Sequence, residues 1–187
     1  QELQDIRGRE IAMIFQDVGA ALDPIEKIKR QYAEAIAVHE KQPKQTYFER
    51  AVGMLQKMHL TDPKRVMDAY PFELSGGMKQ RVGIAMGMTA QPMLLLADEP
   101  TSALDVTIQA QVVHELKELR RKYGTTIILV THNMGVASFL SDKIGVMCKS
   151  QLVEFGSRDE IIYHPKETYT KELLKAVPKL GGRRFAG

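Results

Sequence analysis

Five consecutive apolar residues that end in two acidic residues constrain the fold of this chain more than any other feature. The run Met93–Ala97 is followed directly by Asp98 and Glu99. A continuous apolar run of this length predicts a parallel strand buried on both faces. Because ligands of open α/β sheets bind at the carboxyl ends of strands, we expect both carboxylates at a ligand-binding edge. The first suits Mg²⁺, and the second can orient or deprotonate an attacking water.

Strand and helix patterns alternate along the chain, which favours a parallel α/β sheet. The helical pattern over residues 25–60 is interrupted by Pro43, so it predicts two helices and resembles an inserted subdomain. Strands are expected over residues 10–15, 93–97, 126–130, 143–147 and 152–155, and helices over 107–122, 134–140, 158–163 and 167–176.

Composition excludes several classes of function. The chain has 187 residues and a net charge of +3, which is too small to argue for nucleic-acid binding. Its single cysteine, Cys148, excludes a zinc or iron–sulfur site built from this chain alone. There is no apolar run near 18 residues and no signal peptide, so we expect a reducing, cytoplasmic setting. Because the chain begins with Gln1 rather than Met, we also expect it to start within a longer protein.

A serine and two glycines form a second candidate site. Ser75 can cap the helix that follows it, and Gly76 and Gly77 let backbone N–H groups approach a ligand without a Cβ in the way. Together with the positive end of the helix dipole, they predict a phosphate-binding surface. Taken alone, this pattern is more typical of an ordinary helix cap.

A histidine follows another apolar strand. His132 comes directly after the run 126–130 and Thr131. In that place its imidazole can touch a γ-phosphate and the water bound to a carboxylate. An isolated histidine of this kind is more often structural than catalytic.

Five segments in this order resemble the motifs of ATP-binding-cassette (ABC) ATPases, and the resemblance covers essentially the whole chain. It implies a P-loop NTPase fold of the ABC-ATPase type, in which a RecA-like parallel sheet carries an inserted α-helical subdomain. The matching segments are Gln16 (Q-loop), Leu74–Met78 (signature motif), Leu94–Glu99 (Walker B strand), Ser102–Asp105 (D-loop) and His132 (switch histidine). The implied domains are a core remnant with the Q-loop (1–24), the helical subdomain (25–74), the core with Walker B, D-loop and switch histidine (75–157), and a C-terminal helical extension (158–187).

The resemblance also implies roles for particular residues, with ATP and Mg²⁺ as cofactors. The implied catalytic residues are Glu99, His132 and Gln16, and Asp98 and Gln16 are the implied metal ligands. The nucleotide-binding residues that it implies are Ser75, Gly76, Gly77, Gln80 and Asp105.

Longer stretches narrow the resemblance to the ATPases of oligopeptide, dipeptide and nickel importers. Residues 70–82, 103–112 and 164–178 are similar to the D-type member of the usual pair of non-identical ATPases. The implied partners are a second, F-type ATPase subunit in a head-to-tail dimer, transmembrane permease subunits and, indirectly, a solute-binding protein. The implied location is peripheral, on the cytoplasmic face of the cell membrane. Val18 stands where these proteins usually have proline, in a loop that faces the membrane subunits.

One motif of the family is missing from the sequence. No G-x-x-x-x-G-K-[ST] phosphate loop occurs in the 187 residues, so we expect an N-terminally truncated fold without the first strands and the Walker A loop. We expect these residues alone to be inactive, and to offer Ser75, Gly76 and Gly77 to a nucleotide held by the partner.

Two alternatives differ from an importer ATPase. A regulatory or degenerate subunit would contribute only the signature motif in trans, although intact Asp98, Glu99 and His132 argue against a decayed site. A non-transport ABC protein would be expected to carry coiled-coil insertions or a second cassette, and neither occurs in the sequence.

Overall fold

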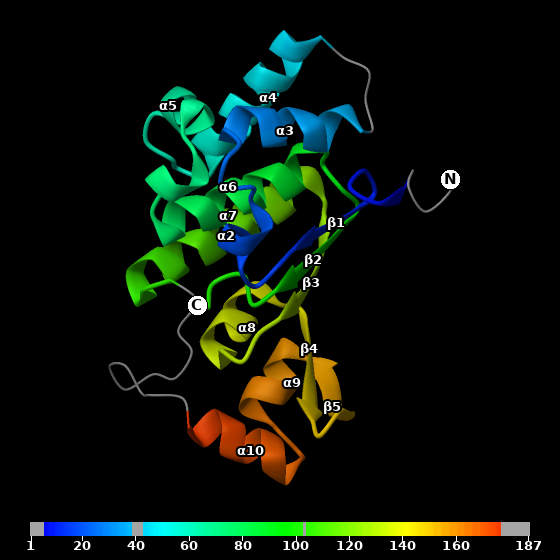
Figure 1. Cartoon of the computed structure of the whole chain (residues 1–187). Coiled ribbons are helices and arrows are strands. Elements are labelled where there is room, and N and C mark those ends of the chain that lie inside the picture. Colours follow the sequence, from blue (N-terminus) through cyan, green and yellow to red (C-terminus); the bar gives the residue numbers. More distant parts are fainter. Residues whose placement is uncertain (1–5, 39–42, 103, 177–187) are drawn as a thin grey trace. The chain divides into compact units, whose positions relative to one another are not determined.

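The computed structural model describes residues 6–38, 43–102 and 104–176, which divide into two compact units, 1–130 and 131–187 (Figure 1). Ala103 of the predicted D-loop and residues 1–5 and 177–187 of the predicted outer segments lie outside the described residues. The first unit contains β1 (Ile11–Ile14), α2 (Val18–Ala21), α3 (Ile28–Ala37), α4 (Lys44–Lys57), α5 (Pro63–Asp68), the 3₁₀ helix η1 (Pro71–Glu73), α6 (Gly76–Thr89), β2 (Leu94–Asp98), α7 (Val106–Tyr123) and β3 (Thr126–Val130). The second contains α8 (Met134–Leu140), β4 (Lys143–Cys148), β5 (Gln151–Ser157), α9 (Arg158–Tyr163) and α10 (Thr168–Lys175).

A parallel sheet of order β1-β2-β3 forms the centre of the first unit, which confirms the predicted parallel pairing. In its register Ile14 lies opposite Ala97, and Asp98 lies opposite Val130. The three strands therefore end at one common edge of the sheet. The break predicted at Pro43 is also confirmed, because α3 and α4 are separate helices on either side of it.

Only one face of this sheet is covered by described residues of its unit. Leu95 and Ala97 are buried, whereas Leu94 and Leu96, which alternate with them along β2, are partly exposed. The prediction that the strand at 93–97 is buried on both faces is therefore wrong for the described chain. Covering of the second face depends on neighbouring elements, which the composition of one strand cannot specify.

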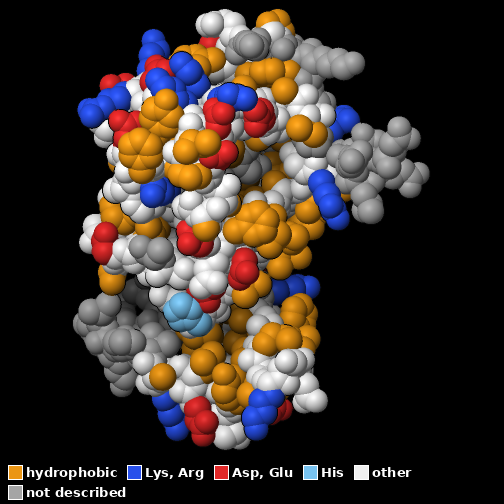
Figure 2. Space-filling view, in the orientation of Figure 1, with side chains coloured by type: hydrophobic (Ala, Val, Ile, Leu, Met, Phe, Trp, Pro, Cys, Tyr) orange, Lys and Arg blue, Asp and Glu red, His pale blue; other side chains and the backbone are white. Residues whose placement is uncertain are grey.

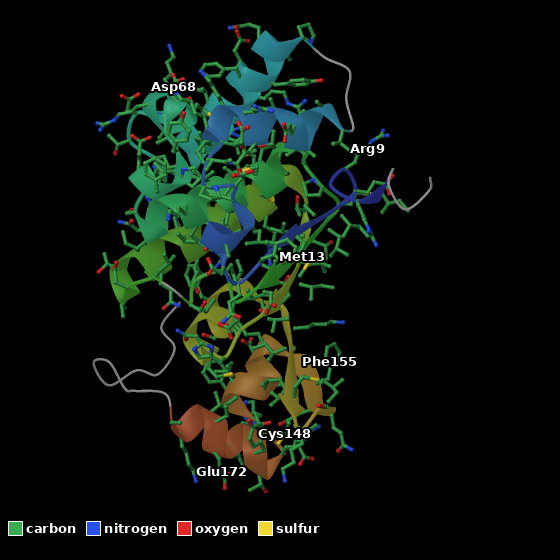
Figure 3. The ribbon with its side chains drawn as sticks, viewed as in Figure 1. Arg9, Met13, Asp68, Cys148, Phe155 and Glu172 are labelled. Atoms are coloured by element: carbon green, nitrogen blue, oxygen red, sulfur yellow. The ribbon has the colours of Figure 1, made fainter. Side chains whose placement is uncertain are left out.

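The covered face packs against α6. Gly87 of α6 lies over this face, since a Cβ added there would be 3.7 Å from both Ile14 Cγ1 and Leu95 Cδ1. The opposite face exposes apolar side chains, among them Met13 on β1 (Figure 3). Hydrophobic side chains also gather on the visible surface near β1 (Figure 2). The exposed apolar residues of β1 and β3 and the segment after β1 are Ile11, Met13, Phe15, Ile128 and Val130.

Buried polar groups attach α3 and α4 to the end of α6. The Thr89 hydroxyl donates to Ala85 O at 2.6 Å and lies 2.5 Å from Tyr32 Oη, so the phenol donates to Thr89 Oγ1. Burial raises the pKa of Tyr32, which keeps that donor protonated. Arg50 of α4 donates to the Thr89 carbonyl at 2.9 Å. Among the helices that the structure describes, none has the length and apolar character needed to cross a bilayer.

The second unit has its own small core around an antiparallel pair of strands, β4 and β5. Two of its helices, α8 and α9, begin at side-chain caps: the Asn133 side chain accepts from Gly135 N at 2.9 Å, and Ser157 forms a capping box with Glu160. Phe155 projects from β5 and is exposed (Figure 3). The core side chains are Met134, Ala137, Ile144, Val146, Ile161, Ile162 and Leu174.

The open apolar face of the sheet predicts that the 187-residue chain by itself associates in solution. β3 is at the end of the strand order among the described residues, and exposed apolar strand edges favour pairing with other chains. We expect Ile128→Lys, at a side chain that is 53% exposed, to reduce association in sedimentation velocity while changing the unfolding free energy by less than about 0.5 kcal/mol. Ile25→Lys, at an exposed loop residue, is the matched control. A monomeric wild-type chain with a sharp, cooperative thermal transition would contradict this expectation.

Candidate functional site

The common edge of the sheet brings three predicted site residues together. Asp98 ends β2 and Glu99 follows it, while Gln16 lies two residues beyond the end of β1. Because β1 and β2 are parallel and in the register described above, all three residues follow strands that end side by side (Figure 1). This is the edge at which open α/β sheets bind ligands.

Glu99 occupies a strained and firmly held backbone position. Its φ of 45° is in the left-handed region, which residues with a Cβ seldom adopt. Its N–H donates to Val130 O at 2.9 Å, and its carbonyl accepts from Ser102 N and Ser102 Oγ, both at 3.1 Å. Strain of this kind persists only where the surroundings enforce it, and it is concentrated at functional sites. Other described residues, among them Asp62 and Gln91, also have positive φ, so the functional role of Glu99 stays a prediction from the sequence.

The oxygen donors at this edge fit a magnesium ion that is held mainly by water and phosphate. Asp98 and Gln16 can supply a carboxylate and an amide oxygen. In the described part of the chain, no group of three or more His, Cys, Asp or Glu residues could form a complete metal cage. Mg²⁺ is typically bound by one or two protein ligands together with substrate phosphates. The chemistry of these two residues is compatible with Mg²⁺, which stays a prediction from the sequence.

The predicted phosphate-binding segment forms the first turn of α6. Ser75 Oγ accepts from Met78 N at 3.3 Å, so Ser75 is the N-cap. A Cβ at Gly76 would meet no atom of the described residues within 4 Å, whereas a Cβ at Gly77 would lie 3.2 Å from Ile108 Cγ2. The two glycines therefore differ: Gly76 leaves the helix end open to a ligand, and Gly77 allows α6 to pack against α7.

Two other predicted nucleotide-binding residues have structural positions within the chain: Asp105 caps a helix and Gln80 is buried. Asp105 Oδ1 accepts from Thr107 N and Ile108 N, both at 3.0 Å, and so caps α7. Gln80 is only 5% exposed, and its Nε2 has no hydrogen-bond partner in the described chain. Gln80 thus lies inside the unit in the second turn of α6, and its role in nucleotide binding stays a prediction from the sequence.

His132 belongs to the second unit rather than to the sheet. It directly precedes Asn133, the N-cap of α8. The backbone N–H of Asn133 donates to Thr131 Oγ1 at 3.1 Å, so the chain around His132 has a defined turn. The contact of His132 with a γ-phosphate stays a prediction from the sequence.

A buried charge pair joins α6 to α7. Arg81 Nη2 donates to Gln111 Oε1 at 2.7 Å, and Arg81 Nε lies 3.6 Å from Glu115 Oε2. The side chain of Glu115 is 4% exposed, and neither Arg81 Nε nor Glu115 Oε2 forms a hydrogen bond with any described residue. Burial raises the pKa of Glu115 to about 7, and the neighbouring Arg81 cation only partly opposes this shift.

Glu115 is absent from the residues predicted by motif, although the sequence carries a signal for it. Val112, Leu116 and Leu119 form an apolar stripe at helical spacing, and Glu115 interrupts it. An acidic residue within such a stripe is either exposed by a twist of the helix or buried with a partner. The partner, Arg81, comes from 34 positions earlier, so its identity could not be read from α7 alone.

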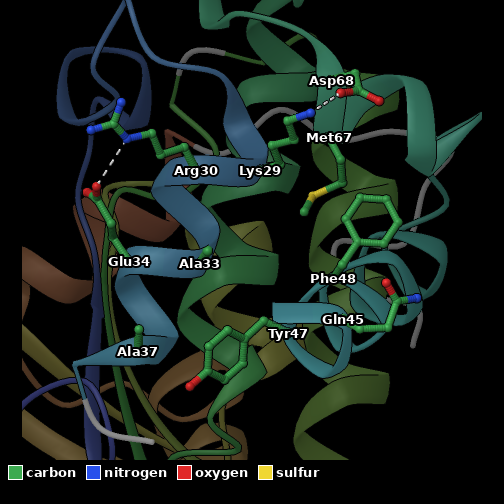
Figure 4. Close-up of a pocket in the computed structure, with 10 residues that line it drawn as sticks. All are labelled: Lys29, Arg30, Ala33, Glu34, Ala37, Gln45, Tyr47, Phe48, Met67 and Asp68. Carbon is green, nitrogen blue, oxygen red and sulfur yellow. Dashed lines mark hydrogen bonds and ion pairs between the residues drawn. The ribbon is translucent and has the colours of Figure 1, made fainter. Parts of the chain in front are cut away.

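A separate hollow of about 750 Å³ lies among α3, α4 and α5 (Figure 4). Its charged residues pair with one another: Lys29 Nζ is 2.6 Å from Asp68 Oδ1, and Arg30 Nε is 3.5 Å from Glu34 Oε1. The Lys29 ammonium lowers the pKa of Asp68. Because these cations already face carboxylates, the hollow does not resemble a phosphate-binding site.

Comparison with known proteins agrees with this assembly of motifs. The family model described as ABC transporter matches residues 1–102. The oligopeptide transport ATP-binding protein OppD of Bacillus subtilis (strain 168) is 46% identical over 180 residues, which cover 96% of this chain and 50% of that protein. The dipeptide transport ATP-binding protein DppD of the same strain is 43% identical, covering 96% of this chain and 54% of its own length. The chain thus spans about half the length of the curated relatives it matches.

Solved structures give the same fold. A dimeric structure of the ATP-binding cassette MJ0796, in a post-hydrolysis state bound to ADP and Pi, superposes with a TM-score of 0.74 at 28% identity. The match covers 84% of this chain and 66% of that one. The structure of cbiO1 from Clostridium perfringens gives a TM-score of 0.71 at 27% identity, covering 82% and 59%. The predicted ABC-ATPase fold class is therefore confirmed.

The buried carboxyl of Glu115 predicts a specific pH dependence of stability. The pKa of Glu115 in the folded chain is above the ordinary value of 4.5, so ionising this carboxyl costs more free energy in the folded chain than in the unfolded chain. Stability should therefore be highest below pH 4.5 with respect to this group, and should fall as the pH rises towards about 7. We expect Glu115→Gln to remove this loss, so that the variant is more stable than wild type by roughly 1–3 kcal/mol at pH 8 and equal to it near pH 4.

Urea unfolding at several pH values measures the effect. Glu118→Gln, an exposed residue on the same helix, is the matched control and should keep the wild-type pH profile. Parallel profiles for Glu115→Gln and wild type would show that Glu115 is not buried as an unfavourable charge.

Proposed function

Because the chain belongs to the ABC transporter family, we propose that it is part of the ATP-binding and ATP-hydrolysing subunit of an importer. We propose di- or oligopeptides as the solute, with nickel as the alternative. The names of two similar relatives, an oligopeptide and a dipeptide transport ATP-binding protein, support the peptide assignment. The observation that carries the ATPase assignment is the convergence of Gln16, Asp98 and strained Glu99 at the carboxyl edge of one parallel sheet.

The residues at this edge have distinct proposed tasks. Asp98 and Gln16 would hold the magnesium ion of Mg-ATP, which supplies charge stabilisation for the phosphates when bound. Glu99 would accept a proton from the attacking water and orient it towards the γ-phosphate. His132 would donate a hydrogen bond to that phosphate. The fixed backbone of Glu99 supports its task, because a general base must be held within hydrogen-bond reach of its water.

The first turn of α6 would act on a second nucleotide. We propose that Ser75, Gly76 and Gly77 face ATP held by a non-identical F-type partner ATPase in a head-to-tail dimer, with Asp105 ordering the turn that precedes α7. The open space beside Gly76 supports this arrangement. Permease subunits and a solute-binding protein would complete the assembly, peripheral to the cytoplasmic face of the membrane. Because the 187 residues contain no phosphate loop, they would not hydrolyse ATP by themselves.

Glu99→Gln tests the catalytic assignment directly. In the complete polypeptide assembled with its partner, we expect ATP hydrolysis to fall about 10²–10⁴-fold, because general-base assistance is lost. ATP binding, measured by equilibrium dialysis, should remain, since the amide keeps the size of the carboxylate. Unchanged steady-state hydrolysis would contradict the role of Glu99 and would favour a regulatory subunit.

Ser75→Arg tests the action on the partner's nucleotide. A bulky cation at the N-cap would block the γ-phosphate from the end of α6, so hydrolysis at the partner's ATP should be lost while that ATP still binds. Mixed dimers that carry the change on one subunit, analysed by single-turnover hydrolysis, separate the two sites. Thr61→Arg, at an exposed residue away from α6, is the control. A defect confined to the mutant chain's own nucleotide would contradict the assignment in trans.

A further inference from the structure

The closest packing at any described glycine joins α6 to the segment that follows Gln16. A Cβ added at Gly83 would lie 2.4 Å from Val18 Cγ1, 2.9 Å from Val18 Cγ2 and 3.2 Å from Val18 Cβ. Real Cβ atoms do not approach other carbon atoms to 2.4 Å. Only glycine therefore fits at position 83 while Val18 keeps its place.

Val18 is held in this contact from its own side as well. It is the first residue of α2, is 5% exposed, and comes two residues after Gln16. The preceding Asp17 caps α2, because its Oδ1 accepts from Ala20 N at 3.0 Å. Valine is branched at Cβ and has a strongly preferred χ1, so moving its methyl groups away from α6 is unfavourable. The position of Val18 thus fixes where the chain leaves Gln16.

Gly83 belongs to α6, the helix that begins at the phosphate-binding turn. It is eight residues after Ser75 in an unbroken helix, which corresponds to about 12 Å along the axis. A glycine inside a helix destabilises it relative to alanine, so this position has a local cost that close packing can offset. Gly53 of α4 provides the contrast: a Cβ there would meet no described residue within 4 Å.

We infer that Val18 and Gly83 are positioning residues. Their contact fixes the position of the segment around Gln16 relative to α6, the helix that Ser75 caps. The inference rests on the proposed function. Gln16 would serve the chain's own nucleotide, and Ser75 would serve the nucleotide held by the partner. Because Val18 packs against Gly83, Gln16 and Ser75 are held at a fixed separation. A displacement of one of them at its nucleotide is therefore transmitted to the other.

A double-mutant cycle tests this inference in the complete polypeptide assembled with its partner ATPase. Gly83→Ala should lower kcat for ATP hydrolysis by roughly ten- to a hundredfold, with less than about a twofold change in KM for ATP, because a displacement near 1 Å in a positioned group has effects of this size. It should also raise the Mg²⁺ concentration for half-maximal rate at least about threefold, since Gln16 is displaced from the metal. Adding Val18→Ala should return kcat to within about threefold of wild type, because only the 3.2 Å contact with Cβ remains.

Val18→Ala alone keeps the test decisive if Gly83→Ala does not fold. This variant removes the methyl groups without creating a clash, and we expect it to fold and to lose about three- to tenfold in kcat. Gly53→Ala is the matched control and should keep the wild-type kcat and Mg²⁺ requirement. Thermal unfolding of each assembly gives a readout apart from activity: the melting temperature should fall by roughly 2–10 °C in Gly83→Ala and recover in the double variant.

The outcomes separate this inference from the proposed function. An inactive wild-type assembly would overturn the proposed function itself. An active wild type in which Gly83→Ala or Val18→Ala behaves like Gly53→Ala would overturn the positioning role alone. The same conclusion would follow if Val18→Ala failed to rescue Gly83→Ala.

Discussion

The close packing of α6 is the constraint on which the rest of the first unit depends. The helix touches three different neighbours through residues that lack a side chain: Gly77 faces α7, Gly83 faces Val18, and Gly87 faces the sheet. Each glycine lowers the intrinsic stability of the helix by about 1 kcal/mol relative to alanine. The helix forms nevertheless, because its other residues bury large apolar side chains against these neighbours, and tertiary packing of this kind outweighs propensity. The short distances between these glycines and their neighbours in turn fix the position of the first turn of α6 relative to the carboxyl edge of the sheet.

Two buried polar groups on the same helix illustrate opposite energetic outcomes. At its end, Thr89 is satisfied by Tyr32 and by the Ala85 carbonyl, so burial there leaves no orphaned hydroxyl. Near its beginning, Arg81 and Glu115 are close enough to interact but too far apart at these atoms to form a hydrogen bond. Burying such a pair costs desolvation that the Coulombic attraction does not recover, and the raised pKa of Glu115 expresses that imbalance. The junction of α6 and α7 at this pair is thus less stable than an apolar junction of the same size would be.

The strained backbone of Glu99, at the edge of the sheet, is maintained by hydrogen bonds to its neighbours. A left-handed glutamate costs about 1–3 kcal/mol, and the hydrogen bonds from Glu99 to Val130 and from Ser102 to Glu99 hold it in place. Glu99 donates the first of these bonds to β3, so its backbone position depends on the pairing of β2 with β3. The backbone of the proposed general base is therefore held both by the sheet and by its own loop.

The sequence by itself determined the element types and the order of the motifs. Apolar runs, Pro43 and the capping residues act locally, so the parallel strands, the two helices after residue 24 and the cap at Ser75 could all be predicted. Only the tertiary structure decided which faces are covered and which residues meet. It left one face of β2 partly open, buried Gln80, paired Glu115 with Arg81, and seated Val18 on Gly83. Each of these outcomes depends on contacts between residues more than 30 positions apart or on the covering of a whole sheet face. The pattern of residues within a single segment of sequence contains no information about either of these.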